Sequence, residues 1–282
     1  MSEIGRTLRV PDANLYYQIC GSGPVLLILQ GGDGDADRAA DLVAQLAEAY
    51  TVVTYDRRGL SRSVIDPDDG RPVPVETHAD DVHRLLAEVT SEPAVVFGSS
   101  IGGLTGLHLA TRHPEQVRVL VTHEPPILDL LADDLCRTVN AGLDEAEELH
   151  RSAGGLPALL RLGALNGVDF RRLATEPGVA MPPPPDERRT ANIEFFLSRD
   201  LPAFREYRLD MDDLDAMKTG PTRVVPAAGQ DSRGVWGYVA AERLAAHLGL
   251  ATSEFPGGHA GLTTHPRAFA ARLREVLSSF GV

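Results

Sequence analysis

The chain has 282 residues, 43% of them apolar and 24% charged, so it can bury a large core and has the composition of an ordinary globular protein. Its formal net charge of −13 at pH 7 argues against a nucleic-acid backbone or an anionic membrane surface as a partner. Because it shows no apolar leader, no membrane-length run and no C-x-x-C pair among its two cysteines, we expect a cytoplasmic protein without a disulfide framework or thiolate metal site.

The first part of the chain alternates strand-like runs with amphipathic runs of helical period. A Pro-Asp turn between two short strands predicts a hairpin over residues 8–20. The elements expected next are a strand at 25–29, a helix at 39–49, a strand at 51–55, a helix around 82–89, a strand at 95–97, a helix ending near 113 and a strand at 117–122. This alternation is typical of a parallel sheet covered by helices on both faces.

From residue 125 to about 219 the strand-like runs disappear. The helical patterns there cover residues 128–139, 143–150, 156–165 and 191–197, and a proline run at 182–185 predicts a stiff, extended connector. We expect residues 125–219 to form a helical cap over the carboxyl end of the sheet, and residues 1–124 and 220–282 to form the core. The alternation resumes with a strand at 222–227, a helix at 239–248, a strand at 252–255 and a helix at 267–280.

Three aspartates with the spacing D-x-D-x-D, at positions 33, 35 and 37, resemble the start of a calcium-binding EF-hand loop. The sixth position of such a loop would be Arg38 instead of glycine, and the twelfth would be Ala44 instead of glutamate. We therefore expect these aspartates to cap the following helix, and we predict no metal site.

The pentapeptide Gly98-Ser99-Ser100-Ile101-Gly102 stands between a β-branched strand and a helix. A G-x-S-x-G sequence in this context is typical of a nucleophile elbow, in which a sharp turn holds the serine in a strained backbone conformation. Glycine is needed on both sides because a larger residue would clash across the turn. The sequence thus predicts that Ser100 is a nucleophile exposed at the carboxyl end of the sheet.

Two loops after the expected cap supply the partners that a nucleophilic serine needs. Asp231 follows the strand at 222–227, and His259 follows the strand at 252–255, so both should lie at the same end of the sheet as Ser100. Glu124 is a rival for the acid, because it follows the strand at 117–122 and could replace or assist Asp231. The chain order Ser100, Asp231, His259 matches a Ser…Asp…His arrangement, and we expect Asp231 to be the acid, with Glu124 as the alternative.

These motifs, together with an Asp56–Ser63 run similar to D-x-R-G-x-G-x-S, resemble the α/β-hydrolase fold family, in particular its capped, esterase-like members. The resemblance covers nearly the whole chain. It implies that Ser100 is the nucleophile, His259 the general base and then acid, Asp231 the orienting acid, and the amides of Gly32 and Ile101 the oxyanion hole.

Three positions depart from the family pattern without removing a triad member. Gln30 replaces a histidine, Ser99 replaces a frequent histidine or aromatic residue, and Leu60-Ser61 interrupts the G-x-G of the Asp56–Ser63 run. We therefore expect a serine hydrolase that needs no metal or cofactor and cleaves a small ester, thioester or amide through an acyl-enzyme. The alternatives are carbon–carbon bond hydrolysis, acyl transfer or cofactor-free oxygen chemistry at the same site, or a small-molecule receptor on a hydrolase scaffold.

Overall fold

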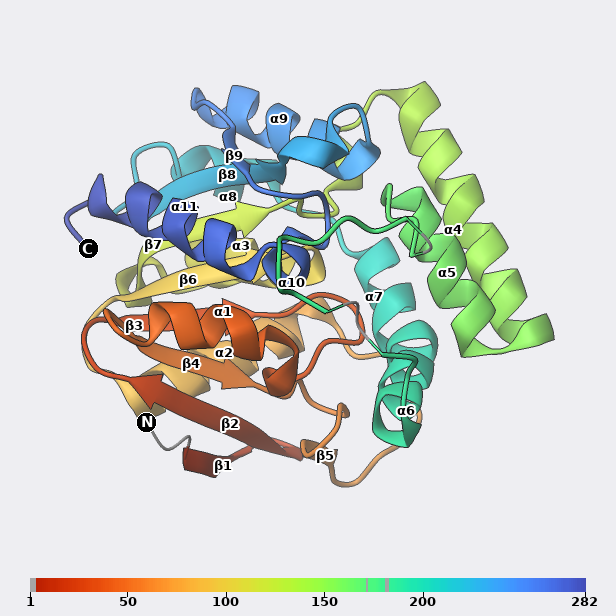
Figure 1. Cartoon of the computed structure of the whole chain (residues 1–282), viewed down its shortest axis with the longest axis horizontal. Coiled ribbons are helices and arrows are strands. Elements are labelled where there is room, and N and C mark those ends of the chain that lie inside the picture. Colours follow the sequence, from red (N-terminus) through yellow and green to blue (C-terminus); the bar gives the residue numbers. More distant parts are fainter. Residues whose placement is uncertain (1–3, 171, 181–182) are drawn as a thin grey trace.

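A computed structural model describes residues 4–170, 172–180 and 183–282. Its centre is one twisted sheet, with helices on both faces and a helical unit at one end (Figure 1). The strands lie in the spatial order β1 (Ile4–Val10), β2 (Ala13–Gly21), β4 (Thr51–Tyr55), β3 (Val25–Leu29), β6 (Ala94–Ser99), β7 (Val117–His123), β8 (Arg223–Gly229) and β9 (Ser253–Phe255), and β5 (Val64–Ile65) pairs with β2.

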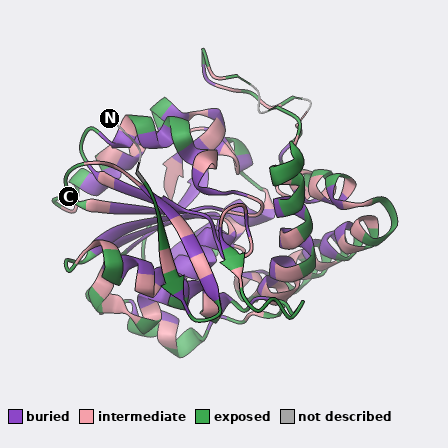
Figure 2. Ribbon diagram, turned by 90° about the horizontal axis from the view of Figure 1, so that it is seen from below, coloured by how far each residue is buried: buried purple, intermediate pink, exposed green. Residues whose placement is uncertain are grey.

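The sheet is mixed but mostly parallel. β1 and β2 form the expected edge hairpin, and β2 also runs antiparallel to β4. From β4 through β3, β6, β7 and β8 to β9, every pairing is parallel. All six residues of β6 are buried, as expected for a strand covered on both faces (Figure 2). The predicted fold class is therefore confirmed.

Two helical layers close the core. One apolar cluster joins the sheet to α1 (Ala40–Leu46) and α11 (Pro266–Ser278), where Leu42, Phe269 and Leu273 are fully buried. A second cluster covers the other face and contains the apolar sides of α2 (Val75–Val89), α3 (Ile101–Arg112) and α9 (Trp236–Leu248). A short 3₁₀ turn, η1 (Ala36–Ala39), precedes α1, and a single-turn helix, α10 (Gly261–Thr264), precedes α11.

A helical insertion separates β7 from β8. It comprises α4 (Asp133–Ala153), α5 (Gly155–Leu165), α6 (Glu187–Phe195), the π-helical turn η4 (Phe196–Asp200), α7 (Leu201–Glu206) and α8 (Met211–Ala216). Part of this insertion projects beyond the carboxyl ends of the strands (Figure 1). The exact borders of a cap at 125 and 219 stay a prediction, and part of the proline run at 182–185 lies outside the described residues.

One prediction within the insertion is wrong. Residues 128–130 form a short 3₁₀ turn, and residues 133–139 and 143–150 belong to a single 21-residue helix, α4, and not to two helices. Gly142 lies inside α4 where α5 packs on it: a Cβ there would stand 2.9 Å from Leu165 Cδ1. The side chain of Asn140 donates to the carbonyl of Cys136 within the same helix.

The aspartates at 33, 35 and 37 make hydrogen bonds and ion pairs with the start of a helix and with part of the insertion. Asp35 caps η1 by accepting a hydrogen bond from the Asp37 amide, as predicted. Arg189 of α6 forms an ion pair with Asp33 at 2.6 Å, and Arg188 pairs with Asp37 at 3.0 Å. Within the described part of the chain, no group of three or more acidic, histidine or cysteine side chains is arranged to hold a metal ion.

Candidate active site

Ser100 stands at the sharp turn from β6 to α3. Its φ of 53° and ψ of −123° are strained for a residue with a side chain, and its amide donates to the carbonyl of His123 on the neighbouring strand at 2.9 Å. A Cβ on Gly98 would lie 2.5 Å from the Gly102 carbonyl oxygen, and a Cβ on Gly102 would overlap the Leu29 carbonyl. The two glycines of the pentapeptide are therefore required by the local packing.

The loop after β3 lies directly against this turn. A Cβ on Gly31 would be 3.0 Å from Ser100 Cβ, so a larger residue there would be tightly packed against the nucleophile turn. Arg57 donates to the carbonyls of Gln30 and Gly32 at 3.3 and 2.6 Å, and the Gly34 amide donates to the Gly31 carbonyl at 2.9 Å. Three successive peptide groups of the loop are thus held by hydrogen bonds.

The amides of Gly32 and Ile101 are both available to a ligand. Neither N–H donates a hydrogen bond to any group in the described part of the chain, and both residues line the same cavity as Ser100. Ile101 is the first residue of α3, where helical N–H groups have no partner within the helix. Both amides are therefore candidate donors to an oxyanion beside Ser100.

The carboxylate that contacts His259 is Glu124. His259 Nδ1 lies 2.7 Å from Glu124 Oε2, and Glu124 Oε1 accepts a hydrogen bond from the Gly229 amide at 2.9 Å. Glu124 directly follows β7 and has a φ of 48°, a strained conformation that directs its buried side chain toward His259.

Asp231, which the sequence favoured for this contact, lies on the wall of a second pocket that His259 also lines. It is exposed on the short 3₁₀ turn η5 (Gln230–Ser232), and its amide donates to the Gly257 carbonyl at 3.0 Å. In the described part of the chain, its carboxylate makes no hydrogen bond with His259. The structure therefore joins His259 to the rival acid, because η5 turns the Asp231 side chain outward immediately after β8.

Burial is the largest single influence on the pKa of Glu124 and would raise it, but the hydrogen bond from His259 and the other favourable contacts together outweigh this effect. Together with the nearby ring of His123 and the Gly229 amide, that bond lowers the pKa of Glu124 to about 2. The ring of His123 is fully buried, and burial lowers the pKa of His123 to about 4. At neutral pH the site thus holds an ionised Glu124 beside a neutral His123.

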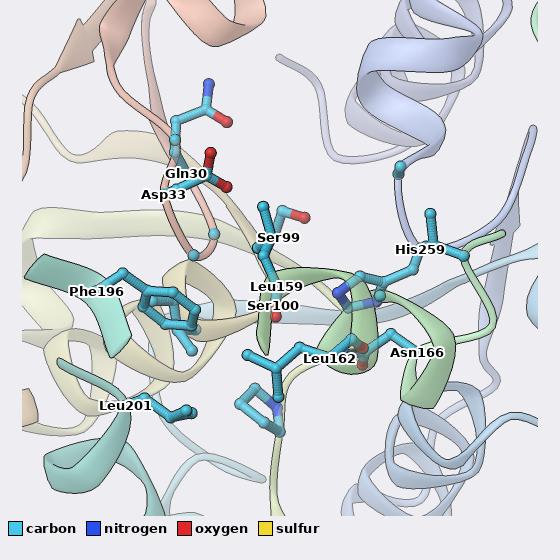
Figure 3. Close-up of a pocket in the computed structure, with 18 of the residues that line it drawn as sticks. Gln30, Asp33, Ser99, Ser100, Leu159, Leu162, Asn166, Phe196, Leu201 and His259 are labelled. Atoms are coloured by element: carbon cyan, nitrogen blue, oxygen red, sulfur yellow. Dashed lines mark hydrogen bonds between the residues drawn. The ribbon is translucent and has the colours of Figure 1, made fainter. Parts of the chain in front are cut away.

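One cavity of about 210 Å³ contains both Ser100 and His259. Figure 3 shows the two residues on its walls, with Leu159, Leu162 and Phe196 from the insertion around them. Trp236 also lines the cavity, although most of its side chain is packed in the apolar core. Because side chains from both the sheet loops and the insertion form its walls, a ligand there would contact both parts of the fold.

The family follows from comparison with known proteins. Residues 24–146 match the α/β-hydrolase fold family. Over 272 residues the chain is 39% identical to the uncharacterized hydrolase YraK of Bacillus subtilis, covering 96% of this chain and 95% of YraK. The chain belongs to the α/β-hydrolase fold family, and it is a hydrolase.

Solved structures share the fold at low sequence identity. An esterase from Thermogutta terrifontis superimposes with a TM-score of 0.71 at 18% identity, with full coverage of both chains. A bacterial membrane phospholipase A gives a TM-score of 0.73 at 20% identity, covering 99% of this chain and 87% of the phospholipase. Within the described ranges, none of the helices is long and apolar enough to cross a lipid bilayer.

Proposed function

We propose that the protein is a serine hydrolase of the carboxylesterase type, which cleaves a small ester, thioester or amide through an acyl-enzyme on Ser100. His259 takes the proton of the Ser100 hydroxyl as the serine oxygen attacks the acyl carbon. The amides of Gly32 and Ile101 stabilise the resulting oxyanion. His259 then gives the proton to the leaving group, and the same residues act in reverse order when water attacks the acyl-enzyme.

In this mechanism Glu124 is the orienting acid. Its hydrogen bond to Nδ1 holds that nitrogen protonated, so that Nε2 is free to accept the serine proton. When His259 becomes charged, the ionised Glu124 carboxylate stabilises it across a bond of 2.7 Å. No step requires a metal or cofactor.

The observation that carries the proposal is the bond between the buried Glu124 and His259, a residue that lines the same cavity as the strained Ser100. A receptor would have no use for this pair, because burying a carboxylate is costly unless its charge is needed. The pair therefore favours catalysis over simple binding. The substrate is proposed to be a small molecule, since the cavity is small and enclosed partly by the insertion.

A fluorophosphonate probe combined with a panel of p-nitrophenyl esters of increasing acyl length tests the proposal. The native protein should be labelled on Ser100 and should hydrolyse short esters, whereas Ser100→Ala should lose labelling and turnover together. Labelling without hydrolysis of any ester would favour acyl transfer or carbon–carbon bond hydrolysis. Turnover that survives Ser100→Ala but not His259→Ala would favour oxygen chemistry with histidine as the base.

A further inference from the structure

Arg38 is an unpaired cation in the wall of the catalytic cavity. It belongs to η1, immediately after the loop that carries Gly32, and its side chain is half-buried. Its guanidinium forms no hydrogen bond and no ion pair with any group in the described part of the chain. A guanidinium carries five donors, so the Arg38 side chain is able to bind an acceptor that enters the cavity.

The other arginines of the cavity wall have partners. Arg189 is joined to Asp33 at 2.6 Å, and Arg205 pairs with Asp144 at 2.7 Å and also with Glu147. Arg38 alone among these three is left with its donors unused.

The surroundings of Arg38 do not neutralise it. Burial lowers the pKa of Arg38 and the neighbouring Arg189 lowers it further, whereas Asp33 and Asp35 raise it. Asp33 is already paired with Arg189, and Asp35 accepts from the Ser61 hydroxyl at 2.7 Å. Arginine remains protonated at neutral pH even when its pKa falls, so the charge persists.

The cavity also differs in charge from the rest of the molecule. Its charged lining side chains are Arg38, Arg189, Arg205 and Asp33. The charges of Arg189 and Arg205 are balanced by Asp33, Asp144 and Glu147, so Arg38 contributes the uncompensated positive charge in a chain whose formal charge is −13. Such a charge in a cavity attracts anions locally.

We propose that Arg38 binds an anionic group of the substrate, so that the preferred substrate is a small acyl compound bearing a carboxylate or phosphate group besides the bond that is cleaved. Both groups match the planar donor fork of a guanidinium, which bonds them through two parallel N–H groups. This inference rests on the proposed serine hydrolase activity and names the substrate class of the same site.

The test compares charged and neutral esters of similar shape. Monomethyl succinate against methyl butyrate places the carboxylate in the acyl part, and 4-acetoxybenzoate against phenyl acetate places it in the leaving group. The ratio of kcat/KM for the charged to the neutral ester is measured for the native protein, Arg38→Gln, Arg38→Lys and Arg243→Gln. Arg243 lies exposed on α9 and does not line the cavity, so its substitution removes the same charge outside the site.

In at least one of the two pairs, Arg38→Gln should lower the charged-to-neutral ratio by about 10- to 100-fold, mainly through KM. Arg38→Lys should restore part of this preference, and Arg243→Gln should leave it unchanged. Benzoate and phenyl phosphate, tested as inhibitors of phenyl acetate hydrolysis, distinguish a carboxylate from a phosphate. The anion that inhibits the native protein more strongly, and whose inhibition is weaker in Arg38→Gln, identifies the group that Arg38 binds.

An unchanged ratio in Arg38→Gln for both pairs, with neutral esters still hydrolysed and Ser100 still labelled, would overturn the assignment of Arg38 while leaving the hydrolase intact. If the native protein hydrolyses none of the esters and takes no label, the proposed hydrolase activity itself fails. The two failures are therefore distinguishable.

Discussion

Glu124→Gln tests the catalytic geometry most sharply, because the two oxygens of Glu124 both face donors. Oε1 accepts from the Gly229 amide at 2.9 Å and Oε2 from His259 Nδ1 at 2.7 Å. A glutamine has one acceptor and one donor at these positions, and the backbone amide of Gly229 cannot become an acceptor. The glutamine NH₂ would then face His259 Nδ1, which moves the ring proton to Nε2 and removes the base.

The expected loss of kcat is about 10⁴-fold, or about 5.5 kcal/mol of transition-state stabilisation at about 1.36 kcal/mol for each factor of ten. The assay is p-nitrophenyl ester hydrolysis, with circular dichroism to show that the variant is folded. Asp231→Asn is the matched control: because its carboxylate is exposed, it should retain activity within about threefold. A large loss in Asp231→Asn with near-normal turnover in Glu124→Gln would refute the reasoning.

Further predictions concern the strained turn, the buried histidine and the insertion. Gly102→Ala should destabilise the fold by about 1–3 kcal/mol in urea unfolding, because its methyl group would press on the Leu29 carbonyl; a neutral effect would contradict the packing. The pKa of His123 is lowered from 6.5 to about 4, so the neutral ring stabilises the fold fully above pH 6.5 and this contribution is lost as the pH falls toward 4. Between pH 6.5 and 4 the free energy of unfolding should fall by about 3 kcal/mol less in His123→Phe than in the native protein. Identical profiles of unfolding free energy against pH for the two proteins would refute this prediction. Labelling of Ser100 should slow hydrogen exchange across residues 125–219 if they form a lid, whereas unchanged exchange there would contradict one.

Most of the sheet could be predicted because its strands are short, apolar and bounded by turn residues. The pattern at 25–29 coincides with β3 and that at 51–55 with β4, since both strands are buried on both faces and leave a continuous apolar run. The helices of the insertion were harder to place. The patterns at 128–139 and 143–150 predicted two helices, whereas residues 133–153 form one helix on which α5 packs at Gly142, and such a contact between helices leaves no local signal.

The site was predictable where the chemistry is local. Ser100 and its two glycines form one pentapeptide, so the turn follows from adjacent residues. The choice between Asp231 and Glu124 depends on which side chain turns inward, and both follow the ends of parallel strands. Only the strained φ of Glu124 and the outward turn at η5 separate them. Whether Arg38 has a partner likewise depends on side chains that are distant from it in the sequence.

Direct observation of the acyl-enzyme tests the central claim best. A reaction with a p-nitrophenyl ester that the protein hydrolyses, quenched in acid after a few milliseconds and measured by intact-mass spectrometry, should show a mass increase of one acyl group. Peptide mapping should place that group on Ser100, and Ser100→Ala should show none. Rapid turnover without any acylated protein, or an acyl group carried by another residue, would contradict covalent catalysis by Ser100.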